Sequence, residues 1–289
     1  MSDKLNHVQA HIAGVEGLES VVGAMRGIAA ARSREARQRL AGIRACAGIV
    51  RTAIGDALLL EQDEQDEEAR TPPLAPAVRA ELHIVFCAGQ GFVGAFNEHL
   101  IDAARAGIYP ARGDACFLVG ERGLTTAQRH GLKVIWSTPM ASHAGEASAL
   151  ADRITQALYD QIGAGRFSRV KIIHAIPSAS AHIAIADELL LPLDLKCFRG
   201  SKRRFRPLVT LPVPRLLQKL AVEYIYTQLF EASMLSFAAE NDARMHAMVA
   251  ERANVRATLE RLMCEFRRLR QEEITAEIVE LSAGCLNNR

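Results

Sequence analysis

The chain has 289 residues, of which 49% are hydrophobic and 24% charged, and its formal net charge is +2. This length suits one large domain or two ordinary ones, and the near-neutral charge argues against a general binder of nucleic acid or of another acidic polymer. The six scattered cysteines argue against a disulfide framework or zinc site and favour a reducing cytoplasm. Because there is neither a signal peptide nor an apolar stretch near about 20 residues, we expect any membrane association to go through a partner.

The first expected element is a long amphipathic helix ending before Pro72, the first proline. Its apolar residues recur every three or four positions, a spacing that keeps side chains on one helix face. Each of its glycines costs a helix about 1 kcal/mol relative to alanine. We therefore expect the helix to lie against a partner, with the small residues permitting a close approach of two backbones. The stripe is Leu5, Val8, Ile12, Val15, Leu18, Val22, Met25, Ile28, Leu40, Ile43, Ala47, Val50, Ile54 and Leu58, and the glycines are at 14, 17, 23, 27, 42, 48 and 55.

Two charged connections bound the middle of the chain. Glu61–Glu68 is rich in carboxylates and is followed by Pro72, Pro73 and Pro76, which together indicate a solvated connection. An exposed basic run is expected at the other end, before Pro207. That run comprises Lys196, Arg199, Lys202, Arg203, Arg204 and Arg206.

The middle region alternates β-prone runs with helical stretches. This rhythm predicts a parallel or mostly parallel sheet covered by helices. The expected strands are Leu82–Ala88, Cys116–Val119, Lys133–Trp136 and Val170–Ile176, with a further strand pair around His182–Leu190, and the expected helices are Asn97–Ala106, Gly123–Arg129 and Glu146–Ile162.

The last expected element is a helix over Arg215–Ala283, a stretch without proline or glycine whose apolar residues keep the helical spacing. At 1.5 Å per residue it would be roughly 100 Å long, which is typical of a shaft, a strut or half of a coiled coil. The predicted fold is thus α/β: a long antiparallel coiled coil of N- and C-terminal helices with an inserted Rossmann-like α/β domain. We place the coiled coil at residues 1–70 and 207–289, and the α/β domain at 78–206.

One motif suggests cofactor chemistry. Gly89-Gln90-Gly91-Phe92-Val93-Gly94 fits G-x-G-x-x-G between an expected strand and an expected helix, where backbone N–H groups could approach a pyrophosphate. Glu121, after the next strand, could then bind a ribose. The simpler interpretation is a tight strand-to-helix turn, because the motif is weak alone and the domain is small for a dinucleotide fold.

Other catalytic patterns are missing from the sequence. There is no G-x-x-x-x-G-K-[ST] loop for ATP, no serine or cysteine nucleophile in a recognisable elbow, and no third ligand to complement His7 and His11. The residues alone therefore indicate no active site, no bound cofactor and no metal.

Several motifs resemble those of the gamma subunit family of rotary F-type ATP synthases. Ile12–Ala36, with Ala24-Met25-Arg26, is similar to the family's opening helix. Ala243–Met248 is similar to its A-R-M-x-A-M motif, and Arg270–Ile278 to its R-Q-x-x-I-T-x-E-I motif. The turn Gly91–Asn97 resembles the family's R-G-L-C-G-G-x-N. The matches cover both ends and the central turn, in the family's order and spacing.

This resemblance implies a non-catalytic rotor subunit that couples ion flow to ATP synthesis or hydrolysis. The helices would form an asymmetric shaft inside a ring of alternating alpha and beta subunits, with the α/β domain at its base against the epsilon subunit and the membrane c-ring. The chain would be peripheral, on the cytoplasmic face of a bacterial cell membrane. Met25 and Arg26 would lie near Arg270 on the paired helix. The implied contacts with the ring are Met25, Arg26, Arg32, Arg270, Gln271 and Thr275.

The sequence also departs from the family pattern. Ala88, Gly89 and Gln90 replace the Ser-Asp-Arg that usually precedes the glycine turn, which leaves the contacts of the central domain open and suggests a divergent bacterial variant. Two other functions remain as alternatives: an NAD(P)-dependent oxidoreductase using the Gly89–Gly94 turn, and a non-catalytic coiled-coil scaffold.

Overall fold

A computed structural model of the chain describes residues 2–64, 80–178, 182–198 and 207–287. The chain forms two compact units. One contains Met1–Ala29 and Met245–Arg289, and the other contains Ala30–Arg244. Helix α1 (Ser2–Glu64) and helix α5 (Val213–Asn287) each contribute to both units. The sequence-based division into 1–70 with 207–289 and 78–206 stays a prediction.

The two long helices confirm the helical periodicity of both ends. Helix α5 begins at Val213, so that Pro214 falls in the first turn, where a missing N–H costs nothing. Helix α1 reaches Glu64, and the expected acidic connection therefore starts inside the helix. The rest of that connection, and the basic residues from 199 to 206, lie outside the described residues.

A five-stranded sheet with the order β3-β2-β1-β4-β5 forms the centre of the larger unit. Strands β1 (Ala80–Phe86), β2 (Ala115–Val119), β3 (Val134–Thr138) and β4 (Phe167–Ile176) run parallel to one another. The expected strand pair after β4 is a single strand, β5 (Ala184–Leu191), which is antiparallel to β4. The mostly parallel sheet is confirmed.

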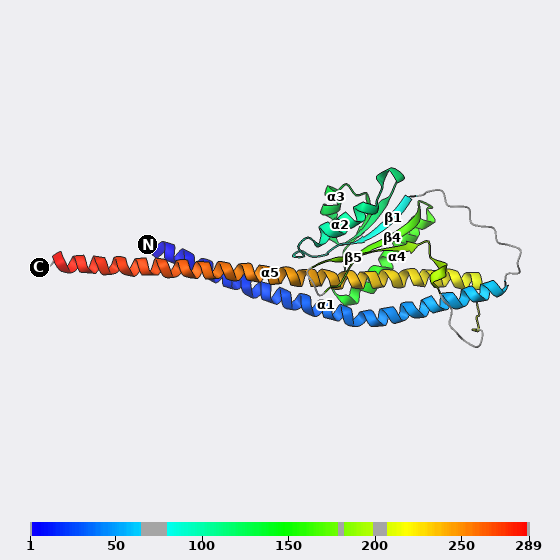
Figure 1. Cartoon of the computed structure of the whole chain (residues 1–289), viewed down its shortest axis with the longest axis horizontal. Coiled ribbons are helices and arrows are strands. Elements are labelled where there is room, and N and C mark those ends of the chain that lie inside the picture. The colour runs from blue at the N-terminus through cyan, green and yellow to red at the C-terminus, as the bar shows by residue number, and fades with distance from the viewer. Residues whose placement is uncertain (1, 65–79, 179–181, 199–206, 288–289) are drawn as a thin grey trace. The chain divides into compact units, whose positions relative to one another are not determined.

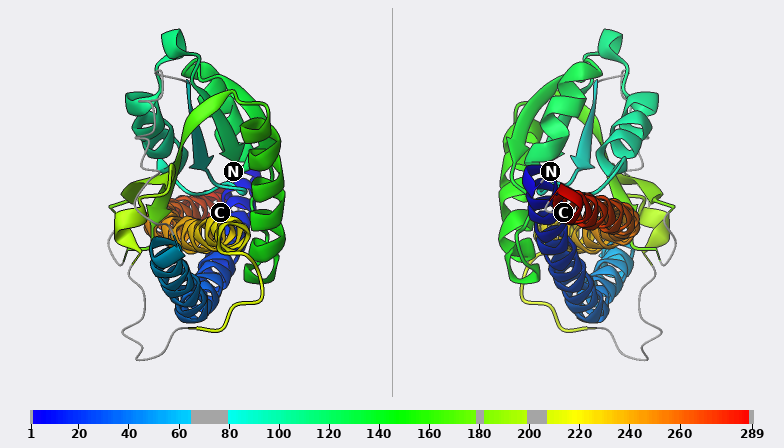
Figure 2. Two further views of the ribbon diagram at one scale, coloured as in Figure 1. Left: turned by 90° about the vertical axis from the view of Figure 1, so that its right-hand side faces the viewer. Right: turned by 90° about the vertical axis from the view of Figure 1, so that its left-hand side faces the viewer.

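Helices cover both faces of the sheet, as Figures 1 and 2 show. On one face, Leu82, Ile84 and Phe86 of β1 belong to a core that includes helix α4 (Ala147–Gly163) and parts of α1 and α5. On the other face, Val85 and its neighbours pack with helix α2 (Phe96–Gly107) and helix α3 (Glu121–Arg129). Alternate residues of β1 thus enter two cores, which is why the strand reads as a continuous apolar run.

The connection from β2 to α3 requires glycine at position 120. Gly120 has φ +99°, and a β-carbon there would overlap the carbonyl of Cys87. A side chain would have to displace backbone at the carboxyl edge of the sheet. This turn brings Glu121 to the same edge as the glycine turn after β1.

Four glycines in the first half of α1 do not serve the close backbone approach expected from the sequence. A β-carbon on Gly14, Gly17, Gly23 or Gly27 would meet no atom within 4 Å beyond its own helix. These glycines therefore weaken the helix without improving its packing in the isolated chain.

Replacing Gly14, Gly17 and Gly27 with alanine should therefore raise the stability of the helix pair. We expect about 0.5–1 kcal/mol per site, because alanine restricts the unfolded chain and fits open space. Thermal and urea unfolding of the single and triple variants measure the gain. A loss of stability would show that these positions are packed in solution.

A buried histidine lies on β1 without a hydrogen bond. His83 is fully buried, and its ring nitrogens have no hydrogen-bond partner among the described residues. Burial lowers the pKa of His83, and Lys171 adds to this, although the carboxylates of Glu81, Asp114 and Asp187 oppose it. The fold thus favours the neutral imidazole.

Replacing His83 with leucine should therefore stabilise the protein and flatten its pH dependence. A folded pKa below the unfolded value of about 6.5 means that stability is present above that pH and lost as pH falls below it. We expect a gain of about 1–3 kcal/mol from removing two buried nitrogens that make no hydrogen bond to any described residue. Urea unfolding at pH 7.5 and 5.5 measures both effects, with His99→Leu on an exposed site as the control. An unchanged pH slope would contradict the assignment.

Candidate functional site

The glycine turn after β1 is closed by a carboxylate from α5. The N–H groups of Gly89 and Gln90 donate to Glu240 Oε2 and Oε1 at 3.2 and 3.1 Å. The preceding N–H, of Ala88, donates to Asn97 Oδ1 at 2.9 Å. In a dinucleotide-binding fold such N–H groups face a pyrophosphate. Here the chain's own carboxylate takes that place, which explains the turn without a cofactor.

Glu240 is paired with an arginine one turn further along α5. Arg244 Nη2 lies 2.6 Å from Glu240 Oε1, and the two side chains are only 6% and 5% exposed. Arg244 also donates from Nε to the carbonyl of Gly91 at 3.1 Å and from Nη1 to Asn241 Oδ1 at 3.1 Å. Each charge is compensated, as burial of an ion pair requires.

A second buried carboxylate, Asp242, joins α5 to α1. Its side chain is 9% exposed, its Oδ1 accepts the hydroxyl of Ser33 at 2.6 Å, and its Oδ2 accepts a short hydrogen bond from Arg37. Towards the other end of this helix pair, Arg44 Nε lies 2.7 Å from Glu231 Oε1. The residue numbers on α1 increase from Ser33 to Arg44 while those of their partners on α5 decrease from Asp242 to Glu231. The two helices therefore run antiparallel within this unit.

A polar hollow of about 240 Å³ opens at the carboxyl edge of the sheet. Arg32, one of three α1 residues predicted to contact the ring, lines it and is partly exposed. Glu121, considered above as a ribose ligand, also lines it and is exposed. The described residues contain no group of three His, Cys, Asp or Glu side chains that could hold a metal. The described residues that line it are Arg32, Gly89, Gln90, Glu121, Pro139, Met140, Ala141, Ser142, Phe237, Glu240, Asn241 and Arg244.

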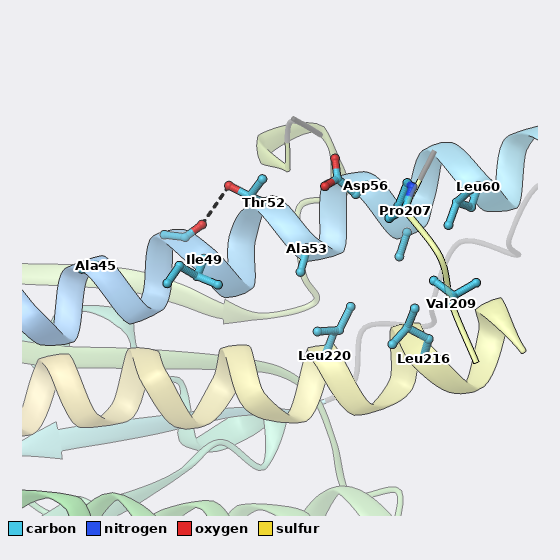
Figure 3. Close-up of a pocket in the computed structure, with 12 residues that line it drawn as sticks. Ala45, Ile49, Thr52, Ala53, Asp56, Leu60, Pro207, Val209, Leu216 and Leu220 are labelled. Carbon is cyan, nitrogen blue, oxygen red and sulfur yellow. Dashed lines mark hydrogen bonds between the residues drawn. The ribbon is translucent and has the colours of Figure 1, made fainter. Parts of the chain in front are cut away.

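A larger apolar hollow, of about 660 Å³, lies between α1 and the start of α5. Figure 3 shows Ile49 and Ala53 of α1 on the side of the hollow opposite Leu216 and Leu220 of α5. Ile49 is 70% exposed, which is unusual for a large apolar side chain. This surface is suited to an apolar partner. The lining also includes Ala45, Gly48, Thr52, Asp56, Ala57, Leu60, Pro207 and Val209.

In the smaller unit, an ionic bridge from Glu19 joins two antiparallel helices. Glu19 Oε1 lies 3.2 Å from Arg252 Nε and 2.8 Å from Arg256 Nε. These arginines lower the pKa of Glu19 through their hydrogen bonds and charge. Val15 packs with Val255 and Leu262 in the adjoining apolar cluster.

This register separates residues that the sequence analysis placed together. Met25 lies beyond Glu19 along α1, whereas Arg270 lies beyond Arg256 along α5, and the helices are antiparallel. The two are therefore roughly 30 Å apart along the pair, at 1.5 Å per residue, so the expectation that Met25 and Arg26 lie near Arg270 is wrong. Arg270, Gln271 and Thr275 do share one short stretch of α5, where all three are exposed and Thr275 Oγ1 donates to the Gln271 carbonyl at 2.7 Å.

Sequence reasoning missed the residues that organise the central site: Glu240, Asp242 and Arg244. The available signal was polar residues in a stretch that is otherwise buried and apolar, next to Phe237, Ala238 and Ala239. The sequence places Arg244 in the A-R-M-x-A-M motif but assigns it no role. Its contact with the glycine turn needs the tertiary structure.

Comparison with known proteins decides the family. The curated ATP synthase gamma chains of Bdellovibrio bacteriovorus and Chlorobium limicola are 24% identical over 301 residues and 25% identical over 292 residues, and each alignment covers 97% of this chain and 97% of the relative. A family model described as ATP synthase matches residues 4–286. The chain belongs to the ATP synthase gamma-chain family. It is accordingly a gamma, central-stalk subunit of an F-type ATP synthase and not a catalytic subunit.

Solved structures share the fold of this gamma chain. A chain of the Euglena gracilis mitochondrial ATP synthase rotor has a TM-score of 0.61 at 11% identity, covering 95% of this chain and 100% of that one. A chain of the Tetrahymena thermophila mitochondrial ATP synthase central stalk and c-ring has a TM-score of 0.55 at 20% identity, covering 80% and 99%. The predicted coiled coil with an inserted α/β domain is confirmed. Neither the oxidoreductase nor the scaffold alternative is supported.

Proposed function

We propose that this gamma chain rotates inside a ring of alternating alpha and beta subunits and couples ion flow through a membrane c-ring to ATP synthesis or hydrolysis. The observation that carries the proposal is the family match over residues 4–286, which includes both long helices and the inserted domain. The named relatives and solved structures are ATP synthase gamma chains and rotor or central-stalk chains. The epsilon subunit is a further partner implied by the resemblance.

The mechanism is differential contact. The two helices present different side chains around the pair, so the three catalytic sites of a ring would each meet a different face. Rotation then changes which conformation of each site is favoured, because a partner shifts an equilibrium only by its differential affinity for the two states. Nucleotide affinity and release thereby depend on the rotor angle.

The proposed shaft comprises residues 1–70 and 207–289, and the proposed base comprises residues 78–206. Ring contacts are assigned to Arg270, Gln271 and Thr275 on α5, and to Arg32, Met25 and Arg26 on α1. All six except Arg32 and Met25 have exposed side chains, and those two are partly exposed. Exposed side chains are available to a surrounding ring.

Membrane association is proposed to go only through partners. No helix in the described ranges is both long and apolar enough to cross a bilayer. We place the chain at the cytoplasmic face of a bacterial cell membrane, bound through the c-ring. The gamma chains of Bdellovibrio bacteriovorus and Chlorobium limicola, both bacteria, support this placement.

Reconstitution tests the proposal directly. Purified chain mixed with bacterial alpha and beta subunits should form a defined hetero-oligomer whose ATP hydrolysis depends on this chain, while the chain alone should hydrolyse no ATP. A mixture without such an oligomer, or hydrolysis that does not depend on the chain, would overturn the proposal.

The double substitution Arg270→Ala with Gln271→Ala should weaken engagement between shaft and ring. Loss of two exposed polar contacts made mainly in the assembled state is expected to reduce coupled ATP hydrolysis by about tenfold, which corresponds to about 1.4 kcal/mol. Arg267→Ala, on the same helix and also exposed, removes the same single positive charge and is the control for loss of charge. Coupled activity equal to that of the unsubstituted complex would remove these residues from the contact.

A further inference from the structure

A five-residue stretch of α5 holds two different parts of the larger unit from opposite sides. Glu240 and Arg244 are four residues apart and therefore share a helix face, whereas Asp242 points roughly 160° away from both. Glu240 and Arg244 bind the turn after β1. Asp242 binds Ser33 and Arg37 of α1. The sheet and α1 are thus tied to α5 at the same level.

The turn after β1 both donates hydrogen bonds to α5 and accepts one from it. Two consecutive N–H groups of the turn point at Glu240, and the next carbonyl, that of Gly91, accepts from Arg244. The pair is buried, with side chains 5% and 6% exposed, so its hydrogen bonds act in a low dielectric and are directional. A network of this kind fixes the rotation of α5 about its own axis relative to the turn.

Elsewhere on α5, apolar packing helps to attach the helix to the rest of the larger unit. Ile225, Leu229 and Phe237 pack into the core beneath the sheet. Such contacts resist separation but are non-directional, so they resist sliding or rotation less than an oriented network does. The larger unit also ends at Arg244, so that the polar network occupies its last turn of α5.

We propose that Glu240, Asp242 and Arg244 form a joint that locks the α/β domain and α1 to α5, and that torque between the shaft and its base passes through this joint. The inference rests on the proposed rotor function. These three residues are positioning residues, because they act through the turn and the helix that they hold. Glu240 and Arg244 transmit torque between α5 and the α/β domain. Asp242 keeps α1 and α5 rotating together.

The test is the double variant Glu240→Gln with Arg244→Met in the complete complex with ring and c-ring. It removes the carboxylate charge, one of the two acceptor oxygens and every Arg244 donor, and it leaves no buried unpaired charge. The matched control is Arg44→Met with Glu231→Gln, an ion pair between α1 and α5 that does not reach the turn. The measurements are ATP hydrolysis, ATP-driven ion transport per ATP, and hydrogen exchange of the Gly89 and Gln90 amides.

We expect the joint variant to hydrolyse ATP, to exchange the two amides about 10–100 times faster, as the loss of charge-assisted bonds implies, and to lose ion transport per ATP. The control should keep all three values. The proposal would be overturned if the Gly89 and Gln90 amides exchanged faster while ion transport per ATP stayed at the level of the unsubstituted complex. If the unsubstituted chain itself failed to assemble or to couple, the proposed function would be the part at fault.

Arg244→Lys gives a second test with less risk to folding. Lysine keeps the charge beside Glu240 but lacks the Nε–H that Arg244 donates to Gly91. A partial loss of transport per ATP at unchanged thermal stability supports the joint. A fall in stability with transport per ATP unchanged would show that the network is only structural.

Discussion

Glu240→Ala is expected to lower the free energy of unfolding by about 3–5 kcal/mol, because it breaks a buried ion pair and leaves the other charge uncompensated. The substitution also leaves two N–H groups of the glycine turn without their acceptor. Urea unfolding of the full chain at neutral pH measures the loss. The loss should be large because neither Arg244 nor the turn has another carboxylate in contact among the described residues.

Glu231→Ala is the matched control for this substitution. Glu231 also pairs with an arginine, but its side chain is 21% exposed and that of Arg44 is 59% exposed. Water and salt screen such a pair, so its loss should cost about 0–1 kcal/mol. Equal losses in the two variants would contradict the assignment of Glu240 as a buried anchor.

Acetate should restore part of the stability lost in Glu240→Ala. Removing the side chain exposes two adjacent N–H groups beside the Arg244 guanidinium, a donor set suited to a small carboxylate. Unfolding measured in sodium acetate and in sodium chloride at equal ionic strength separates specific rescue from screening. No difference between the salts would show that the turn collapses when its carboxylate is lost.

The secondary structure could largely be predicted because the pattern that specifies it is local. Apolar residues spaced by three or four set the faces of α1 and α5, and β-branched runs between helices predicted a mostly parallel sheet. The end of α1 was less clear, since Glu61 and Glu64 continue the helix despite their charge. The charge pattern predicted a solvated connection there, whereas the helix continues to Glu64.

The glycine motif shows where local spacing is insufficient. Gly89, Gly91 and Gly94 have the same spacing in a cofactor turn and in a purely structural one. Glu240 decides between them, because its carboxylate occupies the N–H groups that a phosphate would need. That residue lies far along the chain, on a helix whose periodicity says nothing about which strand it crosses.

Periodicity also fixes the face of a helix but not its register against a partner. The apolar stripes of α1 and α5 predicted that they pair, and the same stripes would fit if one helix slid by a full turn or more. In the smaller unit, the ionic bridge from Glu19 to Arg252 and Arg256 sets the register of α1 against α5. Without it, the sequence analysis placed Met25 beside Arg270.

Asp114→Ala is expected to lower the free energy of unfolding by about 2–5 kcal/mol, because two N–H groups lose their acceptor. Asp114 is fully buried just before β2 and accepts N–H groups from Glu81 and Tyr109, both at 2.8 Å. Arg112 Nη2 donates to it at 2.8 Å. The residue thus ties the beginnings of β1 and β2 together, and urea unfolding measures its contribution.

The pH dependence of Asp114→Asn distinguishes charge from shape at this position. Burial by itself would raise the pKa of Asp114, but the donors from Glu81, Tyr109 and Arg112 outweigh burial and hold the pKa below its ordinary value. A carboxylate with a depressed folded pKa stabilises the fold above the unfolded pKa of about 3.9, and this contribution is lost as pH falls through the folded pKa. The variant should therefore be less stable than the unsubstituted chain at pH 7, and the difference should shrink in strong acid. Asp102→Asn, whose side chain is 58% exposed, is the control that should show little change. If the difference at Asp114 persists unchanged below pH 2, the carboxylate charge is not what holds the two strands together.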